Sequence, residues 1–162
     1  MDFQERLKRA IERGEKTRVE QAQVEAREQL SLGELKTLHS GFRLELADHI
    51  ESCLKQLADQ MPGFEFQSIV SEEGWGGRLS RDDLELKPGQ SASTRYSRLE
   101  MTISPFTPTA IVELLTKGTV RNREIMNRTN YQKVDEFNMD SFKEMIDHRV
   151  LEFAEQFSSS SQ

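Results

Sequence analysis

Apolar side chains in the first 30 residues recur at steps of three and four positions, which is the period of an α-helix. Gly14 weakens this predicted helix, because an interior glycine costs roughly 1 kcal/mol relative to alanine. The apolar residues after Gly14 are few and small, so we expect only partial contact with the rest of the chain. The helix either protrudes as a contact for a partner, or lies on its own domain. Its stripe consists of Phe3, Leu7, Ala10, Ile11, Val19, Ala22, Ala26 and Leu30.

A second helix is predicted to start at Ser31. Ser31 and Glu34 have the spacing of a capping box, in which each side chain satisfies a backbone amide of the other residue. Met61-Pro62-Gly63 ends the helix, because proline lacks an amide donor and glycine permits a turn. The stripe expected to be buried is Leu35, Leu38, Phe42, Leu46, Ile50, Cys53, Leu54 and Leu57.

The period of the apolar positions changes to two after this helix, which is typical of β-strands. Strands are predicted over Phe64 to Ile69, Arg78 to Leu86 and Thr94 to Ser104, with the first two joined at Glu72 to Gly77. Trp75 lies among the glycines of that junction, where it either caps the edge of the core or contacts a partner. The inward residues of the third strand are Leu99, Met101 and Ile103.

Thr109 to Val134 is predicted to form a β-hairpin. A three-residue loop, Thr116-Lys117-Gly118 with Gly118 left-handed, gives one apolar face and a wet face that includes Arg121 and Arg123. This register pairs Leu114 with Val120, Glu113 with Arg121, and Ile111 with Arg123.

A last helix is predicted to start at Asp140 as its N-cap and to lie across the apolar face of the sheet. The fold class is therefore α+β: a two-layer sandwich of N-terminal helices, an antiparallel sheet of about five strands and a C-terminal helix. We expect an amphipathic helical extension over 1–30, a single domain over 31–157 and a disordered tail over 158–162. The inward residues of the last helix are Phe142, Met145, Ile146, Val150, Phe153 and Phe157.

Charge is uneven along the chain. The net charge is -6, yet residues 94–133 carry seven Lys and Arg against three Asp and Glu. The overall acidity makes nucleic acid an unlikely partner, and no apolar run approaches the ~20 residues of a spanning helix, so no membrane contact is expected. A cytoplasmic protein is the resulting expectation. The basic face could hold a small anionic ligand or a nucleic-acid strand, or it could simply be a solvated, salt-bridged surface. Its candidate residues are Arg98, Arg121, Arg123 and Arg128, with Tyr96 for stacking.

No catalytic motif is present in the sequence. It contains neither G-x-S-x-G nor H-E-x-x-H, so no catalytic residue is assigned, and we expect no cofactor. His39 and His49 lie ten residues apart rather than one helical turn, and they are interpreted as structural histidines. Cys53, the only cysteine, is interpreted as a small core residue, and no metal site is predicted.

The sequence alone does not determine a function. The leading hypothesis is a non-enzymatic protein-interaction or self-association module, acting as a homo-oligomer or with a protein partner through the N-terminal helix. This hypothesis rests on the N-terminal amphipathic helix, which is additional to the elements that form the predicted core. The candidate interaction residues are Phe3, Leu7, Ile11 and Trp75.

Overall fold

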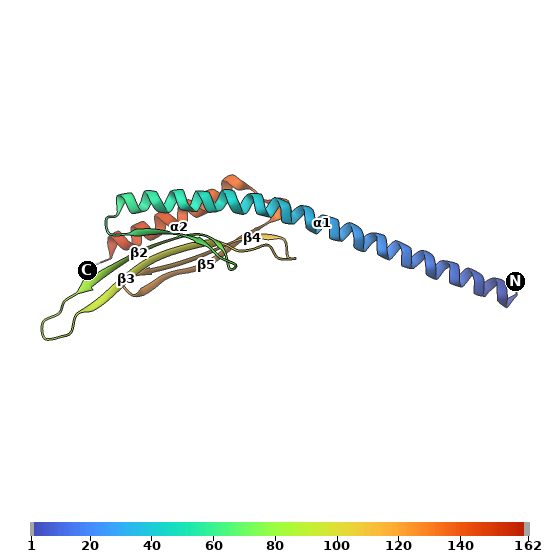
Figure 1. The fold of residues 1–162 in the computed structure, drawn as a ribbon, viewed down its shortest axis with the longest axis horizontal. Coiled ribbons are helices and arrows are strands. Elements are labelled where there is room, and N and C mark those ends of the chain that lie inside the picture. The colour runs from blue at the N-terminus through green and yellow to red at the C-terminus, as the bar shows by residue number, and fades with distance from the viewer. Residues whose placement is uncertain (1, 161–162) are drawn as a thin grey trace.

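Two helices lie on one face of a five-stranded antiparallel sheet (Figure 1). The computed structural model describes residues 2–160, with the backbone alone at positions 29 and 30. The predicted α+β class, with its antiparallel sheet and C-terminal helix, is confirmed. The elements are α1 (Phe3–Gln60), β1 (Glu65–Val70), β2 (Trp75–Glu85), β3 (Ser93–Ile103), β4 (Ile111–Val120), β5 (Arg123–Lys133), the 3₁₀ turn η1 (Val134–Glu136) and α2 (Met139–Ser159).

The helix α1 is one uninterrupted helix of 58 residues. Its N-cap is Asp2, whose carboxylate accepts the amide of Glu5 at 2.9 Å. The prediction that a second helix begins at Ser31 is wrong. Residues on both sides of Ser31 are strong helix formers, and Gly14 and Gly33 have open space around them, so each costs stability without forcing a break.

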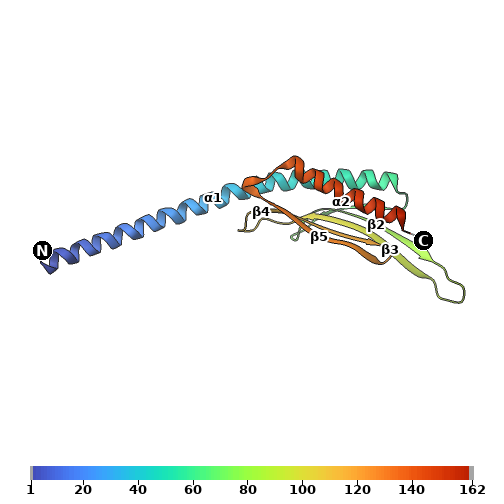
Figure 2. The ribbon, with the colours of Figure 1, turned by 180° about the vertical axis from the view of Figure 1, so that it is seen from behind.

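The C-terminal part of α1 belongs to the core, whereas its N-terminal part projects away from the body (Figures 1 and 2). Among the side chains of α1 that the structure describes, His39 is the first to be buried, and Leu46, Ile50 and Leu54 are fully buried against the sheet. Burying each such side chain contributes about 1.5 to 3 kcal/mol. These contacts fix the body end of the helix firmly.

The sheet has the strand order β1-β2-β3-β4-β5, so every strand pairs with its sequence neighbour. Leu99, Met101 and Ile103 of β3 are fully buried, as their alternation predicted. The turn between β1 and β2 is shorter than predicted, because Trp75 and the two glycines after it already belong to β2. A Cβ at Gly76 would overlap the carbonyl oxygen of Met101, so glycine permits the close approach of β3.

The hairpin of β4 and β5 turns at a different place from the one predicted. The turn is formed by Arg121 and Asn122, which have φ angles of 47° and 68°, and Gly118 lies inside β4. The predicted register is therefore wrong, since Leu114 pairs with Asn130 and Glu113 with Tyr131. Asparagine tolerates the left-handed region, and two such residues give a turn whose twist matches that of the flanking strands.

The helix α2 starts one residue after Asn138, whose side chain accepts the amide of Ser141 at 3.0 Å. The prediction of Asp140 as the N-cap is wrong, because Asn138 provides that oxygen earlier. The predicted buried stripe is confirmed, with Met145 partly buried. The helix runs to Ser159, and residues 161–162 of the predicted tail lie outside the described residues. Across residues 2–160, neither helix contains a stretch long and apolar enough to cross a membrane.

Candidate functional site

The projecting part of α1 is the first candidate site. Every residue from 2 to 28 is exposed, and we call this segment the arm. At a rise of 1.5 Å per residue, the arm extends roughly 40 Å. Phe3, Leu7 and Ile11 follow one another at four-residue steps, with exposed fractions of 73%, 48% and 54%. Apolar side chains of this size at helical spacing form a continuous uncovered stripe.

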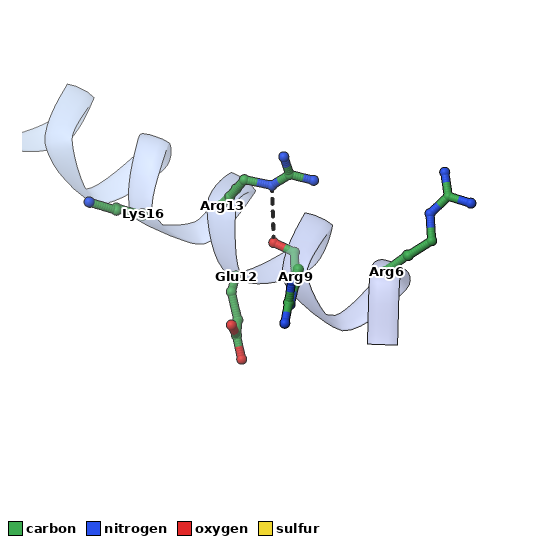
Figure 3. A pocket seen from close by; sticks show the side chains of 5 residues that line it. All are labelled: Arg6, Arg9, Glu12, Arg13 and Lys16. Atoms are coloured by element: carbon green, nitrogen blue, oxygen red, sulfur yellow. Dashed lines mark hydrogen bonds between the residues drawn. The ribbon is translucent and has the colours of Figure 1, made fainter. Parts of the chain in front are cut away.

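A basic face lies on the far side of the helix from this apolar stripe. The side chains that line it are Arg6, Arg9, Glu12, Arg13 and Lys16, all from one helix (Figure 3). The Arg13 Nε donates to the carbonyl oxygen of Arg9 at 3.3 Å, and the remaining charged groups point into solvent. The arm is therefore amphipathic, with an apolar face and a cationic face roughly 140° apart around the helix axis.

Trp75, the fourth predicted interaction residue, is occupied within its own domain. It is half-buried at the start of β2, and the guanidinium of Arg43 from α1 lies 4.0 Å from the centre of its ring. A cation over an aromatic face contributes about 0.5 to 2 kcal/mol. Trp75 thus joins α1 to the sheet and is separate from the arm.

Arg121 and Arg123 lie at the end of the sheet beside the C-terminus of α2. The Arg121 guanidinium is 4.5 Å from the ring centre of Phe157 and donates to the hydroxyl of Ser160. Both arginines line one hollow, together with Arg95. Arg121 is therefore directed toward α2 and away from the outer face of the sheet.

The other predicted anion-binding residues lie elsewhere. Tyr96 and Arg98 are on the outer face of β3, with the guanidinium 5.5 Å from the ring centre. Arg128 reaches the helix side of the sheet and forms a salt bridge of 3.1 Å with Glu152 of α2. The four arginines are thus divided among three places, and only Arg121 and Arg123 are neighbours.

A second cluster of reactive side chains, which the sequence did not predict, joins α1 and α2. It consists of His49, Cys53 and Asp147, all half-buried. The His49 Nε2 lies 2.8 Å from the Asp147 Oδ1 and 3.5 Å from the Cys53 Sγ, and the thiol donates to the same carboxylate oxygen at 3.3 Å. We call these three residues the HCD cluster.

The geometry of the HCD cluster does not support a nucleophilic cysteine. Burial, with the hydrogen bond and the charge of Asp147, raises the pKa of the Cys53 thiol to about 12. The imidazole uses a single nitrogen, Nε2, toward both partners, whereas a catalytic triad needs the base to contact the acid and the nucleophile through different nitrogens. The three donor atoms instead converge on one point, as metal ligands do.

One signal for this cluster was present in the sequence. His49 and Cys53 are four residues apart and therefore share one face of a helix. The third residue, Asp147, comes from α2, so its position beside His49 and Cys53 depends on how α2 packs against α1. The two helices run in the same direction, and the salt bridge of Lys143 with Glu45 lies one turn before the pair of Asp147 with His49.

Comparisons of the chain with protein-family models, with curated proteins and with solved structures find no match.

Proposed function

We propose that the chain is a non-enzymatic, cytosolic self-association module whose arm pairs with the arm of a second copy. The observation that carries the proposal is the arm itself: 27 consecutive exposed residues, 2 to 28, on a helix that continues into the core. An isolated helix gains little from its own propensity, and most helical stability in proteins comes from packing an apolar face. A second helix against the stripe of Phe3, Leu7 and Ile11 supplies that packing.

The charge along the arm favours an antiparallel pair. Residues 6–18 carry six Lys and Arg against two Glu, whereas residues 19–28 carry three Glu against one Arg. A parallel pair would set the basic segment against itself. An antiparallel pair sets each basic segment against the acidic segment of the other copy, and such flanking charges determine orientation in helix pairs.

The expected affinity follows from the apolar area. Six large side chains, three from each copy, gain at most about 1.5 to 3 kcal/mol each, or roughly 9 to 18 kcal/mol in total. Association costs about 4 to 15 kcal/mol in lost translational and rotational freedom and in the ordering of interface side chains. The two ranges overlap, so the pair is expected to be reversible and to depend on protein concentration.

Light scattering and sedimentation over a concentration series test the pair. The wild-type chain should approach twice the monomer mass of 18.7 kDa, and Leu7→Glu should lower that mass toward one monomer. Leu86→Glu is the matched control, because Leu86 is 74% exposed in the β2–β3 loop. A monomer at all concentrations refutes self-association, and capture of an acidic protein by such a monomer would indicate a different partner.

Charge reversal tests the orientation. One variant reverses Arg6, Arg9, Arg13 and Lys16 to Glu, and the other reverses Glu20, Glu25 and Glu28 to Lys. Each alone places like charges together in the antiparallel pair and should be monomeric. The variant that carries both sets of reversals exchanges the basic and acidic segments, so it should pair with itself in the antiparallel arrangement, as wild type does. Mixed with wild type, it would set like charges together in an antiparallel pair and opposite charges together in a parallel pair. Formation of that heterodimer therefore contradicts the antiparallel arrangement.

A further inference from the structure

We propose that the HCD cluster is a binding site for one divalent transition metal ion, with Zn²⁺ as the best fit. The inference is independent of the arm, since the cluster lies between the two helices of the body. His49 and Cys53 come from consecutive turns of α1, and Asp147 comes from α2.

The distances between the donor atoms match a tetrahedral site. With Zn–S of ~2.3 Å, Zn–N of ~2.0 Å and Zn–O of ~2.0 Å, tetrahedral angles place sulfur about 3.5 Å from nitrogen and from oxygen, and nitrogen about 3.3 Å from oxygen. The corresponding distances here are 3.5, 3.3 and 2.8 Å. The contact of His49 with Asp147 must lengthen most, by about half an ångström, and that of Cys53 with Asp147 by about 0.2 Å on that geometry.

The donor types select among metals. A thiolate and an imidazole favour zinc and other late first-row ions, whereas calcium and magnesium require oxygen ligands. Binding needs Cys53 as a thiolate, so its proton passes to solvent. His49 binds through Nε2 as the neutral tautomer that carries its proton on Nδ1. A 2+ charge at this point offsets the repulsion between the thiolate and the Asp147 carboxylate.

Three protein ligands leave the fourth tetrahedral position for water or an external ligand. The cluster opens into a groove of about 480 Å³ between the helices, bordered by Ser52 and Gln56 on the polar side and by Val150 and Leu151 on the apolar side. The site is therefore reachable from solvent. An ion bound there would also join α1 to α2.

Cobalt substitution in the full chain tests the site. Protein that has been reduced and freed of metal by a chelator is titrated with Co²⁺. We expect one equivalent to give strong visible bands typical of tetrahedral Co²⁺ and a near-ultraviolet thiolate-to-cobalt charge-transfer band. Zn²⁺ should remove both. Weak octahedral bands without charge transfer would overturn the proposal.

Variants identify the ligands. Cys53→Ser should remove the charge-transfer band, and His49→Gln and Asp147→Asn should each weaken Zn²⁺ binding at least tenfold in a chelator competition.

Asp48→Asn and His148→Gln are the matched controls, since they neighbour two ligands in sequence but lie outside the cluster. Each should change Zn²⁺ binding less than twofold. Circular dichroism checks folding, and the partly exposed Asp147 provides a variant that should fold even if the cysteine variant does not. Equal binding by wild type and Asp147→Asn, or equal losses in the controls, would overturn the assignment.

Discussion

Asn122 should contribute more to stability than other exposed asparagines, because it holds the β4–β5 turn in place. Its φ angle is 68°, its Oδ1 accepts the amide of Tyr96 at 2.9 Å, and its own amide donates to the carbonyl of Tyr96 at 2.9 Å. Alanine in the left-handed region costs about 1 to 2 kcal/mol. The lost side-chain hydrogen bond adds about 0.5 to 1.5 kcal/mol. We therefore expect Asn122→Ala to lower the free energy of unfolding by roughly 1.5 to 3.5 kcal/mol on these terms.

Two further variants separate these contributions. Asn122→Gly keeps the left-handed backbone and loses only the side-chain bonds, to the amide of Tyr96 and more weakly to the carbonyl of Thr94, so it should be less destabilising than alanine. Asn127→Ala, at an exposed position of β5 in the same hairpin, should lie within about 0.5 kcal/mol of wild type. Urea unfolding at one fixed protein concentration measures all three, because association would otherwise shift the midpoint. If alanine at 122 is as harmless as alanine at 127, the turn does not lie at Arg121 and Asn122.

Three other predictions concern the core and the basic hollow. Burial and the nearby guanidinium of Arg43 lower the pKa of His39, so the unfolded chain binds this proton more readily than the folded chain. The free energy of unfolding should therefore be highest above the ordinary histidine pKa and should fall as the pH drops below it. Urea titrations at several pH values should show a smaller dependence on pH for His39→Leu. Phe153→Ala should cost about 3 to 5 kcal/mol by removing a fully buried ring, whereas exposed Leu151→Ala on the same helix should cost about 0.5 kcal/mol or less; similar values for both would contradict the packing of α2. The alternative function, anion binding, predicts that the chain binds a short oligonucleotide or an acidic metabolite in a salt-dependent way, and that the double variant Arg121→Ala, Arg123→Ala abolishes this binding. The absence of binding by wild type at low salt would reject this function.

The sequence predicted those parts of the fold in which burial follows a regular period. The alternation of β3 and the stripe of α2 are strong patterns, because each buried residue is repeated at the step that the backbone imposes. Predictions that rested on a few local residues were wrong. A capping-box spacing at Ser31 also occurs inside a continuous helix, and the Lys117–Gly118 pair resembles a turn although Gly118 is a packing position next to Phe153.

The candidate sites divide in the same way. The apolar stripe of the arm could be read from spacing, since its residues belong to one helix. The HCD cluster required Asp147 to be placed beside residues nearly 100 positions earlier, and no local pattern determines that docking. Nearness in sequence groups the arginines, whereas the antiparallel register and the turn place them apart.

The continuity of α1 makes the arm a spacer of fixed length and orientation. Because the same helix carries Leu46 and Ile50 in the core, the distance and the rotational phase of Phe3 are both fixed relative to the body. Inserting one residue near position 31 would move the tip outward by only about 1.5 Å but turn its apolar face by about 100°. Inserting seven would restore that face almost fully while adding about 10.5 Å of reach. The reach of the arm and the direction of its apolar face can therefore be changed separately. Inserting whole turns changes the reach, and inserting a single residue mainly changes the direction.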